Sequence, residues 1–527
     1  MLRVSPTCAR ACARLISVQT FLVLALVAVL AVVAAAPATA ASGNPDVKRY
    51  RYRIGPFHIQ PGQNEIAFRP VLKSERPAVP GYITRIRPDL TYLDGRRPRV
   101  DVVHLHHAVW LNLSRRDATM GGPERFFAAG EEKTIFMLPP GYGYYYDPND
   151  RWVLNHMLHD LVGKPADVYV VYEIDFVPAD SPTGRKMKAA RPIWMDVQNG
   201  SLYPVFDVYR RAGGDGKFTY PDEQPNAYKG RPKNVWTVDQ DGVLLAGAGH
   251  LHPGGLYTDL WLKRNGVRPA RVSCRQRSAA ARRRCRARAL TVDGSWVRLL
   301  RSKAKYFGKK GPVDWDLAMT GSPANWRVEV RKGDKLRINA TYDSSRAAWY
   351  ESMGIMVLYM AVGERGKNPF KTKVDYIGRT THGRLPENID RGGRPTNLPN
   401  PLKLPAGGPA PPVIGIADFR YQVGDFLLPG NGKRPPIVRR GQRITFVNGD
   451  EGKLAYHSVT SCREPCNRSS GISYPLADGR FDSGQLARKL PGVGRVQWTL
   501  NTAGLKPGTY TYFCRIHPFM RGSFRVQ

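Results

Sequence analysis

Acidic residues are scarce in this chain of 527 residues: 43 Asp and Glu oppose 80 Lys and Arg, a formal net charge of +37. A field of this sign attracts polyanions such as acidic glycans, anionic lipid surfaces or nucleic acid. The densest basic patch, residues 271–288, holds eight arginines and no acidic residue. No nucleic-acid-binding motif accompanies this patch, so we expect a solvated loop closed by a disulfide and no specific nucleic-acid partner.

Long hydrophobic runs are also missing, apart from one of 16 residues at 21–36. Three arginines and no acidic residue precede this run, and an A-x-A pattern at Ala38 and Ala40 follows it. This order predicts a signal peptide over residues 1–40, because a membrane-spanning helix needs 18 or more apolar residues. We therefore expect a secreted, periplasmic or cell-envelope protein without a transmembrane anchor after cleavage; an uncleaved anchor is the alternative.

Cysteine is rare, with seven residues, two of which lie within the predicted signal peptide. In an oxidising compartment, cysteines close in sequence are expected to form disulfides. The natural pairs are Cys274 with Cys285 and Cys462 with Cys466. Cys514 is left over, which makes it an intermolecular disulfide partner, a buried hydrophobe or a metal ligand.

The neighbours of Cys514 favour the ligand. Cys514, His517 and Met520 follow the strand-like run "GTYTYF", so one short loop carries a thiol, an imidazole and a thioether. These donors together select copper, and a site of two histidines, one cysteine and a distant axial methionine is the blue-copper arrangement. The second imidazole is predicted to come from His457, in the strand-like segment "LAYHSVTSC".

Residues 413–527 resemble a cupredoxin, and their ligand loop is most similar to the amicyanin and plastocyanin group. The pieces that carry the resemblance are "IADFRYQVGDF", "GQRITFVNGD", "AYHSVTSC", "RFDSGQL" and "PGTYTYFCRIHPFMRG". The resemblance implies a Greek-key β-sandwich that carries one electron, with His457, Cys514, His517 and axial Met520 as copper ligands. The insert "CREPCNRSSGISYPLADG" departs from the plainest members and is expected to cover or reshape the exposed edge of the copper.

Residues 382–412 are dominated by Pro, Gly and Asn, which predicts an extended linker and a tethered copper domain. The region before it is rich in strand-like apolar runs separated by Gly and Pro. Its length fits two antiparallel β-sandwiches, 41–189 and 190–381. The predicted fold class is therefore all-β, with tandem sandwiches followed by a cupredoxin sandwich.

His250 and His252 lie two residues apart on an apparent strand. Side chains with this spacing leave the same face of a strand, so the two imidazoles can hold one metal together. Stacked surface histidines are the alternative. Met353 lies in an apolar run and would by default be a core residue.

These pieces resemble the copper type II, ascorbate-dependent monooxygenases, the family of peptidylglycine α-hydroxylating and dopamine β-monooxygenases. The resemblance is carried by "GHLHPGGLYTDLW" and "TYDSSRAAWYESMGIMVLYM" and extends over about 100–362. It implies an oxygen-activating copper held by His250, His252 and Met353.

The same resemblance implies a second, electron-relaying copper at His106 and His107 in "HLHHAVW". On a regular strand, spacing alone would pair His104 with His106, and a β-bulge is needed to bring adjacent rings to one ion. The third ligand stays open. The candidates are Asp175, which stands where the family has histidine, and His156 or His159 of "LNHMLHD"; otherwise this copper is weak or absent.

The combined prediction is a secreted copper protein with one type 1 copper and up to two type 2 coppers. In this hypothesis the copper of Cys514 delivers electrons to the copper of His250, His252 and Met353, replacing or supplementing ascorbate, and oxygen activated there hydroxylates a C–H bond. The expected electron source is a redox partner protein or a small reductant such as ascorbate. One alternative is a non-catalytic electron carrier or copper-handling protein, for which one copper per chain is expected instead of three. Another is a basic cell-envelope protein that binds an acidic surface or polyanion.

Overall fold

The computed structural model describes the chain from residue 44 to 527, with gaps. The segments outside the description are 1–43, 61–65, 101, 162–163, 199–203, 224–232, 271–273, 276–277, 309–310, 313–314, 386–397, 451–454, 463–465, 467–474 and 488–494. The predicted signal peptide, 1–40, therefore lies outside the described residues. Contacts divide the chain into Met1–Val47 and Lys48–Gln527. No helix in the described part of the chain is long and apolar enough to cross a membrane.

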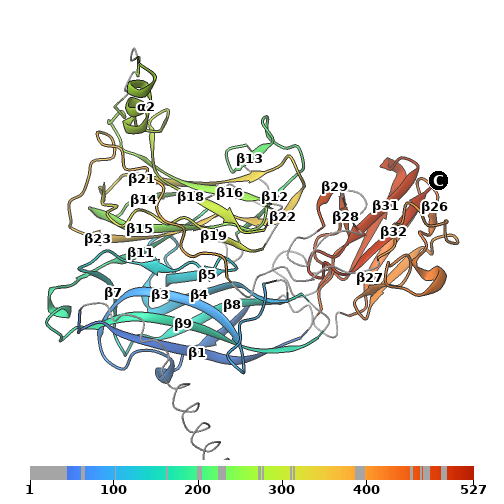
Figure 1. Ribbon diagram of the computed structural model, residues 1–527, viewed down its shortest axis with the longest axis horizontal. Helices are drawn as coiled ribbons and strands as arrows, with labels where there is room; N and C mark the ends of the chain where they lie inside the picture. The colour runs from blue at the N-terminus through green and yellow to red at the C-terminus, as the bar shows by residue number, and fades with distance from the viewer. Residues whose placement is uncertain are drawn as a thin grey trace, which may run out of the picture. The chain divides into compact units, whose positions relative to one another are not determined.

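The first sandwich (blue to cyan in Figure 1) consists of a six-stranded and a four-stranded sheet. The six-stranded sheet has the order β1 (Lys48–Ile59), β9 (Ala166–Pro178), β3 (Gly81–Tyr92), β7 (Tyr142–Tyr146) and β10 (Lys188–Ala189), with β6 (Phe136–Met137) beside β3. The four-stranded sheet has the order β2 (Ala67–Pro70), β8 (Trp152–Asp160), β4 (Val103–Arg116) and β5 (Pro123–Gly130). The inward side chains of both sheets, such as Leu90 and Leu105, form one hydrophobic core.

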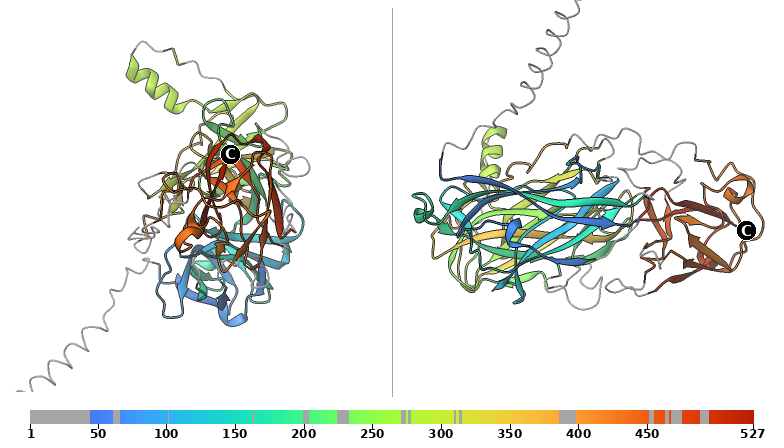
Figure 2. Two further views of the ribbon diagram at one scale, coloured as in Figure 1. Left: turned by 90° about the vertical axis from the view of Figure 1, so that its right-hand side faces the viewer. Right: turned by 90° about the horizontal axis from the view of Figure 1, so that it is seen from below.

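The second sandwich also pairs two sheets. The four-stranded sheet has the order β11 (Arg191–Asp196), β23 (Ile355–Val362), β15 (Gly242–His250) and β20 (Val328–Val330). The seven-stranded sheet has the order β13 (Lys217–Tyr220), β21 (Lys335–Asp343), β16 (Gly255–Lys263), β18 (Trp296–Tyr306) and β17 (Val292–Asp293), with β14 (Val235–Thr237) beside β21 and β19 (Leu317–Met319) beside β18. A short pair, β12 (Val205–Val208) and β22 (Trp349–Met353), lies outside both sheets. The right-hand view of Figure 2 shows the long strands of both sandwiches running in nearly the same direction.

Strand β15 explains why part of the sequence is apolar without alternation. Leu244 belongs to the core of the second sandwich, whereas Val243 and Leu245 belong to the core of the first. Both faces of this strand are therefore covered, and both require apolar side chains. The two sandwiches pack together through the sheets that contain β4 and β15, and the histidines of both strands lie near this contact.

The C-terminal region (orange to red in Figure 1) is a third sandwich. One sheet has the order β25 (Arg420–Tyr421), β24 (Val413–Ala417), β27 (Arg443–Asn448) and β30 (Gln497–Asn501). The other has the order β26 (Ile437–Val438), β32 (Arg521–Val526), β31 (Gly508–Phe513), β28 (Thr460–Cys462) and β29 (Ala477–Asp482). The prediction of an all-β protein built from mainly antiparallel sandwiches is confirmed.

Helices are few and short in the described residues. The α-helix α2 (Ala279–Arg288) is capped by Ser278 and lies in the basic segment for which a loop was predicted. Short 3₁₀ helices are η1 (Lys73–Glu75), η2 (Gly184–Lys186), η4 (Gly430–Lys433) and η6 (Thr502–Gly504). The predicted Cys274–Cys285 disulfide is confirmed and connects α2 to the segment before it.

The predicted Cys462–Cys466 disulfide is wrong for this structure, in which both residues are buried free thiols. The Cys466 Sγ donates instead to the carbonyl of Tyr512, at 3.6 Å. The two thiols also contact each other, and burial, with this contact second, raises the pKa of Cys462 well above its ordinary value.

The C-terminal sandwich and the second sandwich are in direct contact, although the linker composition predicted a tethered domain. Ala348 and Ala477 form an isolated β-bridge, with the Ala348 N–H donating to the Ala477 carbonyl at 3.0 Å. Phe513, which directly precedes Cys514, packs in the same small hydrophobic cluster. The exact limits of the predicted domains, including the linker 382–412, remain predictions.

Candidate metal centres

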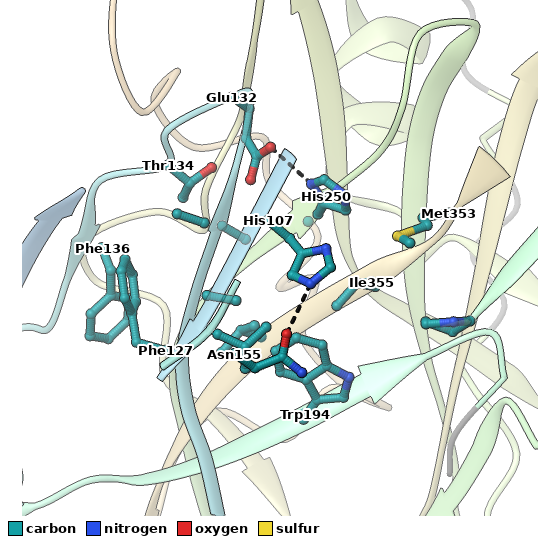
Figure 3. Close-up of a pocket in the computed structure, with 17 residues that line it drawn as sticks. His107, Phe127, Glu132, Thr134, Phe136, Asn155, Trp194, His250, Met353 and Ile355 are labelled. Atoms are coloured by element: carbon teal, nitrogen blue, oxygen red, sulfur yellow. Dashed lines mark hydrogen bonds and ion pairs between the residues drawn. The ribbon is translucent and has the colours of Figure 1, made fainter. Parts of the chain in front are cut away.

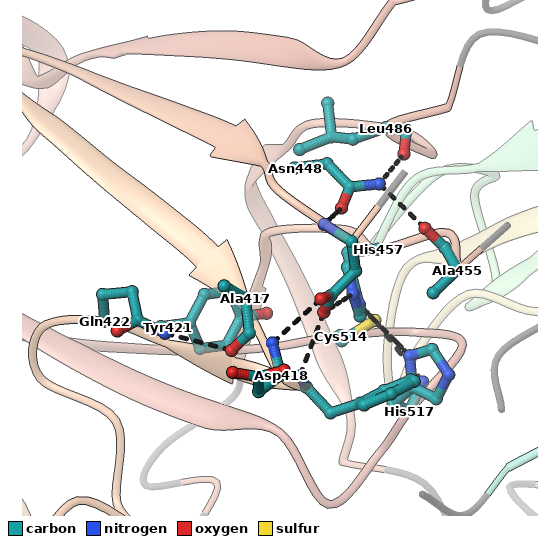
Figure 4. Close-up of polar contacts among 12 residues, drawn as sticks. Ala417, Asp418, Tyr421, Gln422, Asn448, Ala455, His457, Leu486, Cys514 and His517 are labelled. Atoms are coloured by element: carbon teal, nitrogen blue, oxygen red, sulfur yellow. Dashed lines mark hydrogen bonds and ion pairs between the residues drawn. The ribbon is translucent and has the colours of Figure 1, made fainter. Parts of the chain in front are cut away.

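The C-terminal region brings three predicted ligands together in one buried cluster. The Cys514 Sγ lies 3.9 Å from the His457 Nδ1 and 3.7 Å from the His517 Nδ1, and the two Nδ1 atoms are 3.2 Å apart. All three side chains are inaccessible to solvent, and so is that of Met520. Figure 4 shows the imidazoles of His457 and His517 with Cys514 close to them. We call these four residues the thiolate site.

The local fold fixes three of these residues within seven positions. Strands β31 and β32 pair antiparallel, and the segment that joins them carries Cys514, His517 and Met520. The Cys514 N–H donates to the Met520 carbonyl at 3.1 Å, and the Met520 N–H donates to the His517 carbonyl at 2.9 Å. These two backbone bonds close the loop on itself, which fixes the positions from which the three side chains leave it.

Polar neighbours orient the ligands. The His457 Nε2 contacts the Asp450 carboxylate at 3.0 Å, and that carboxylate also accepts the backbone N–H of Asp418 and of Phe419. The Cys514 Sγ accepts the backbone N–H of Ser458 at 3.3 Å and of His517 at 3.4 Å. Carboxylate partners of this kind fix the tautomer and orientation of a metal-binding imidazole.

The electrostatics of the thiolate site favour an ionised cysteine. Burial alone would raise the pKa of Cys514, but its contacts with His457 and His517 lower that pKa well below the ordinary value. Burial acts to lower the pKa of His457, but the contacts with Asp450 and Cys514 together outweigh burial, so that the net pKa is raised. A buried thiolate beside two imidazoles and a thioether is a donor set suited to copper.

Strand β4 contains the bulge that the paired histidines require. Its register with β8 shifts between Leu105 and His107, which leaves His106 without a partner in the ladder. Leu105 and Ala108 belong to the core of the first sandwich, so His106 and His107 both leave the opposite face, toward the second sandwich. The two rings nevertheless join different groups of side chains.

His106 joins a cluster that spans both sandwiches. It lies with His104 and His159 in one group of possible metal ligands and with Glu131 and His252 in another. The His106 ring stacks on His159, with centroids 4.1 Å apart, and its centroid is 4.7 Å from that of His252. We call His106, His159 and His252 the histidine site.

His107 turns instead into an apolar pocket that it shares with His250 and Met353. Figure 3 shows these three side chains with Asn155, whose Oδ1 lies 3.0 Å from the His107 Nε2. The other walls include Phe127, Phe136, Trp194, Ile355 and Val357. We call His107, His250 and Met353 with these walls the methionine pocket.

The ligand sets therefore differ from those predicted. His250 and His252 have ring centroids 5.2 Å apart, yet β15 ends at His250 and the two rings line different pockets. His106 and His107 are likewise divided between the histidine site and the methionine pocket. The predictions that each pair holds one metal are not supported by this arrangement.

Of the three candidates for the third ligand, the structure places only His159 beside His106. The prediction of Asp175 is wrong, because Asp175 lies on β9 in the other sheet and pairs with Arg49 at 2.7 Å. Its sequence neighbours Ile174 and Phe176 point into the core, so Asp175 points away from it. His156 lies on the opposite face of β8 from His159 and contacts Phe57.

Two glutamates of the cluster were missed from the sequence. The Glu131 Oε1 lies 2.5 Å from the His106 Nδ1, and the Glu132 Oε2 lies 2.8 Å from the His250 Nδ1. Burial, with Glu132 second, raises the pKa of Glu131 well above the ordinary value. Burial also acts to raise the pKa of Glu132, but the contact with His250 and backbone hydrogen bonds together lower it. The adjacent pair "EE" directly after an apolar strand was the available signal.

Burial favours the neutral form of five histidines around these two sites, His104, His106, His107, His159 and His252. It lowers the pKa of His104 and of His107 to about 4, and the pKa of the three residues of the histidine site falls well below the ordinary value. Neighbouring imidazoles lower the pKa of the histidine site further. Neutral imidazoles are the form that binds metal ions.

Comparison with known proteins gives partial matches to solved structures. No family model and no curated protein matches this chain. A Cu(I) structure of one amicyanin mutant matches with 21% identity over 22% of this chain and 80% of its own, with a TM-score of 0.15. A Cu(I) form of another amicyanin mutant matches with 21% identity over 25% of this chain and 95% of its own, also with a TM-score of 0.15. We therefore infer function from the side-chain geometry.

Proposed function

We propose that the thiolate site binds a type 1 copper and that the protein transfers single electrons through it. The observation that carries this proposal is the convergence of the Cys514 Sγ and two imidazole Nδ1 atoms within 3.2–3.9 Å, fully buried. Copper bound to such a set supplies one-electron chemistry between Cu(I) and Cu(II). The ligands are His457, Cys514 and His517, with Met520 as the axial thioether.

The chain's own residues prepare this site before the metal arrives. Asp450 holds the His457 ring through Nε2, so that Nδ1 faces the sulfur. Two backbone N–H groups hold the sulfur in place and stabilise its negative charge. Little rearrangement is then needed between the two oxidation states, which is the property an electron carrier requires.

The test is the visible spectrum of the Cu(II)-loaded protein. We expect an intense thiolate-to-copper absorption band that disappears in Cys514→Ser. The Cys466→Ser variant is the matched control, because Cys466 is another buried free thiol of the same region outside the thiolate site. A copper-replete, colourless wild-type protein would rule the proposal out.

A second candidate function is oxidation of an apolar substrate with oxygen at the methionine pocket. The observation that favours it is a pocket with two imidazoles, one thioether and otherwise mostly apolar walls. Two nitrogens and a thioether are ligands that suit copper, and the aromatic walls would hold an apolar group beside them. The electrons would come from a small reductant such as ascorbate or from a redox partner protein.

Oxygen uptake tests this candidate. With copper, ascorbate and a panel of apolar substrates, we expect substrate-dependent oxygen consumption that falls at least tenfold in His250→Ala. His58→Ala is the control, because this exposed histidine pairs with Asp167 and is not among the residues lining the pocket. Uptake that does not depend on substrate or on His250 would leave the protein as an electron carrier only.

A further inference from the structure

We infer that the helix α2 is a docking surface for a linear acidic polysaccharide, whose anionic groups pair with the arginines of this helix. The helix lies between β16 and β18 in the sequence and carries five arginines and no acidic residue. None of its residues is buried, and Figure 1 shows it lying beyond the β-sheets of the second sandwich. This surface needs no metal and is therefore separate from the proposed function.

The arginines of α2 differ from others of the same sandwich, because they have no carboxylate partners. On β18, for example, Arg301 pairs with Asp259 at 2.6 Å. Within the described part of the chain, no carboxylate pairs with the four exposed arginines of α2, which are Arg283, Arg284, Arg286 and Arg288. We call these four residues the α2 arginines. Their guanidinium groups are available to an external anion.

Like charges lie next to one another on α2. Arg284 and Arg288 are four residues apart, and so are Arg282 and Arg286. Side chains with this spacing are neighbours on a helix, and a pair of like charges there destabilises the helix. An anion between the two guanidinium groups offsets the repulsion, and carboxylate and phosphate groups match the guanidinium with two hydrogen bonds. Binding of a polyanion is therefore expected to stabilise the helix.

Two local features keep α2 ordered in spite of this repulsion. The Ser278 Oγ accepts the backbone N–H of Ala281 at 3.1 Å, which caps the N-terminus of the helix. The Cys274–Cys285 disulfide ties the helix to the segment before it. The arginines are thereby held in a fixed arrangement before a ligand arrives, which lowers the entropic cost of binding.

The side chains of α2 favour a flexible acidic polymer over a membrane or a nucleic acid. Apart from arginine, the helix contains only alanine and Cys285. It therefore has no large apolar side chain to insert into a bilayer and no aromatic ring on which a base could stack. Arg284 and Arg286 point in directions about 160° apart around the helix axis. A planar surface contacts one side of a helix, whereas a flexible polysaccharide chain can follow arginines on opposite sides.

The experiment measures the affinity of the full chain for heparin, a linear acidic polysaccharide, at several salt concentrations. We expect binding that weakens steeply as the salt concentration rises, because contacts between cations and a polyanion release counterions. Removing the α2 arginines should weaken binding about tenfold or more, since each such contact adds to the affinity. The variant carries Arg283→Ser, Arg284→Ser, Arg286→Ser and Arg288→Ser.

The matched control loses the same charge at exposed residues elsewhere on the surface. It carries Lys48→Ser, Arg51→Ser, Lys164→Ser and Lys403→Ser. We expect less than about a threefold loss of affinity, because these residues contribute only to the overall field of the protein. Circular dichroism verifies that both variants are folded. Equal losses of affinity in the two variants would overturn the docking surface.

A further variant, Cys274→Ser with Cys285→Ser, keeps every arginine but removes the disulfide. We expect weaker binding of heparin at unchanged net charge, and affinity equal to that of the wild type would overturn the role of the ordered helix. Phosphatidylglycerol vesicles and single-stranded DNA test the class of partner. If either binds to the wild type at least as tightly as heparin at the same salt concentration, the assignment to a polysaccharide is overturned.

Discussion

The thiolate site and the histidine site are built in contrasting ways. Three of the four residues of the thiolate site lie on one loop between β31 and β32, and the fourth comes from a neighbouring segment of the same sandwich. The histidine site takes its residues from three segments of two sandwiches and contains no sulfur. The first site therefore depends on local loop geometry, whereas the second depends on how two sandwiches pack.

Because of this difference, the two sites should respond differently to structural shifts elsewhere in the protein. A loop closed by its own backbone bonds keeps its ligands together even if distant parts of the protein shift. A site between sandwiches is assembled only when both sandwiches dock in register.

Removing the carboxylate behind His457 should weaken copper binding at the thiolate site. In Asp450→Asn the partner of the His457 Nε2 loses its charge, and loss of such an outer partner typically costs about 10–100-fold in metal affinity. Competition with a chelator measures the affinity. Asp478→Asn is the control, because Asp478 bonds Ser461 in the same sandwich; equal losses in both variants would contradict the account.

Acid should destabilise the metal-free sandwiches before it affects the thiolate region. His104 and His107 have a pKa of about 4 in the folded protein against about 6.5 unfolded. Between pH 6.5 and 4 the unfolded chain therefore binds protons at these two imidazoles that the native state does not bind. The free energy of unfolding decreases as the pH falls through this window. The expected loss is on the order of a few kcal/mol.

Asp450 behaves in the opposite sense, because its lowered pKa contributes stability above about pH 4 that is lost only at lower pH. Thermal unfolding of the metal-free protein as a function of pH is the measurement. A free energy of unfolding that stays level from pH 6.5 to 5 would contradict the conclusion that His104 and His107 are buried and neutral in the native state.

Replacing the axial thioether should tune the thiolate site without dismantling it. In Met520→Leu the loop and the other three ligands remain, and the loss of a sulfur donor disfavours Cu(II) relative to Cu(I). We expect the blue band to persist and the reduction potential to rise by some tens of millivolts. Voltammetry checks this, and an unchanged or lower potential would show that Met520 is not a ligand.

The residues of the thiolate site could be grouped correctly from the sequence, whereas those of the histidine site could not, and the reason is physical. Cys514, His517 and Met520 are close in sequence, so spacing alone brings them together. The bulge at His106 and the end of β15 at His250 decide which ring faces which neighbour. Neither feature has a local sequence signal as strong as a ligand loop, so family spacing grouped His106 with His107 and His250 with His252.

Other differences between the sequence-based predictions and the structure have similar causes. Asp175 occupied the position expected for a ligand, yet β9 belongs to the sheet away from the cluster. The continuous apolar run of β15 indicated a buried strand but not that its two faces serve different cores. The all-β fold itself was predictable, because alternation and Gly and Pro punctuation depend on local chemistry.

The most direct measurement is a crystal structure of the copper-loaded protein with anomalous diffraction at the copper edge. The account predicts a peak among His457, Cys514 and His517. The absence of a peak beside Cys514 would contradict it.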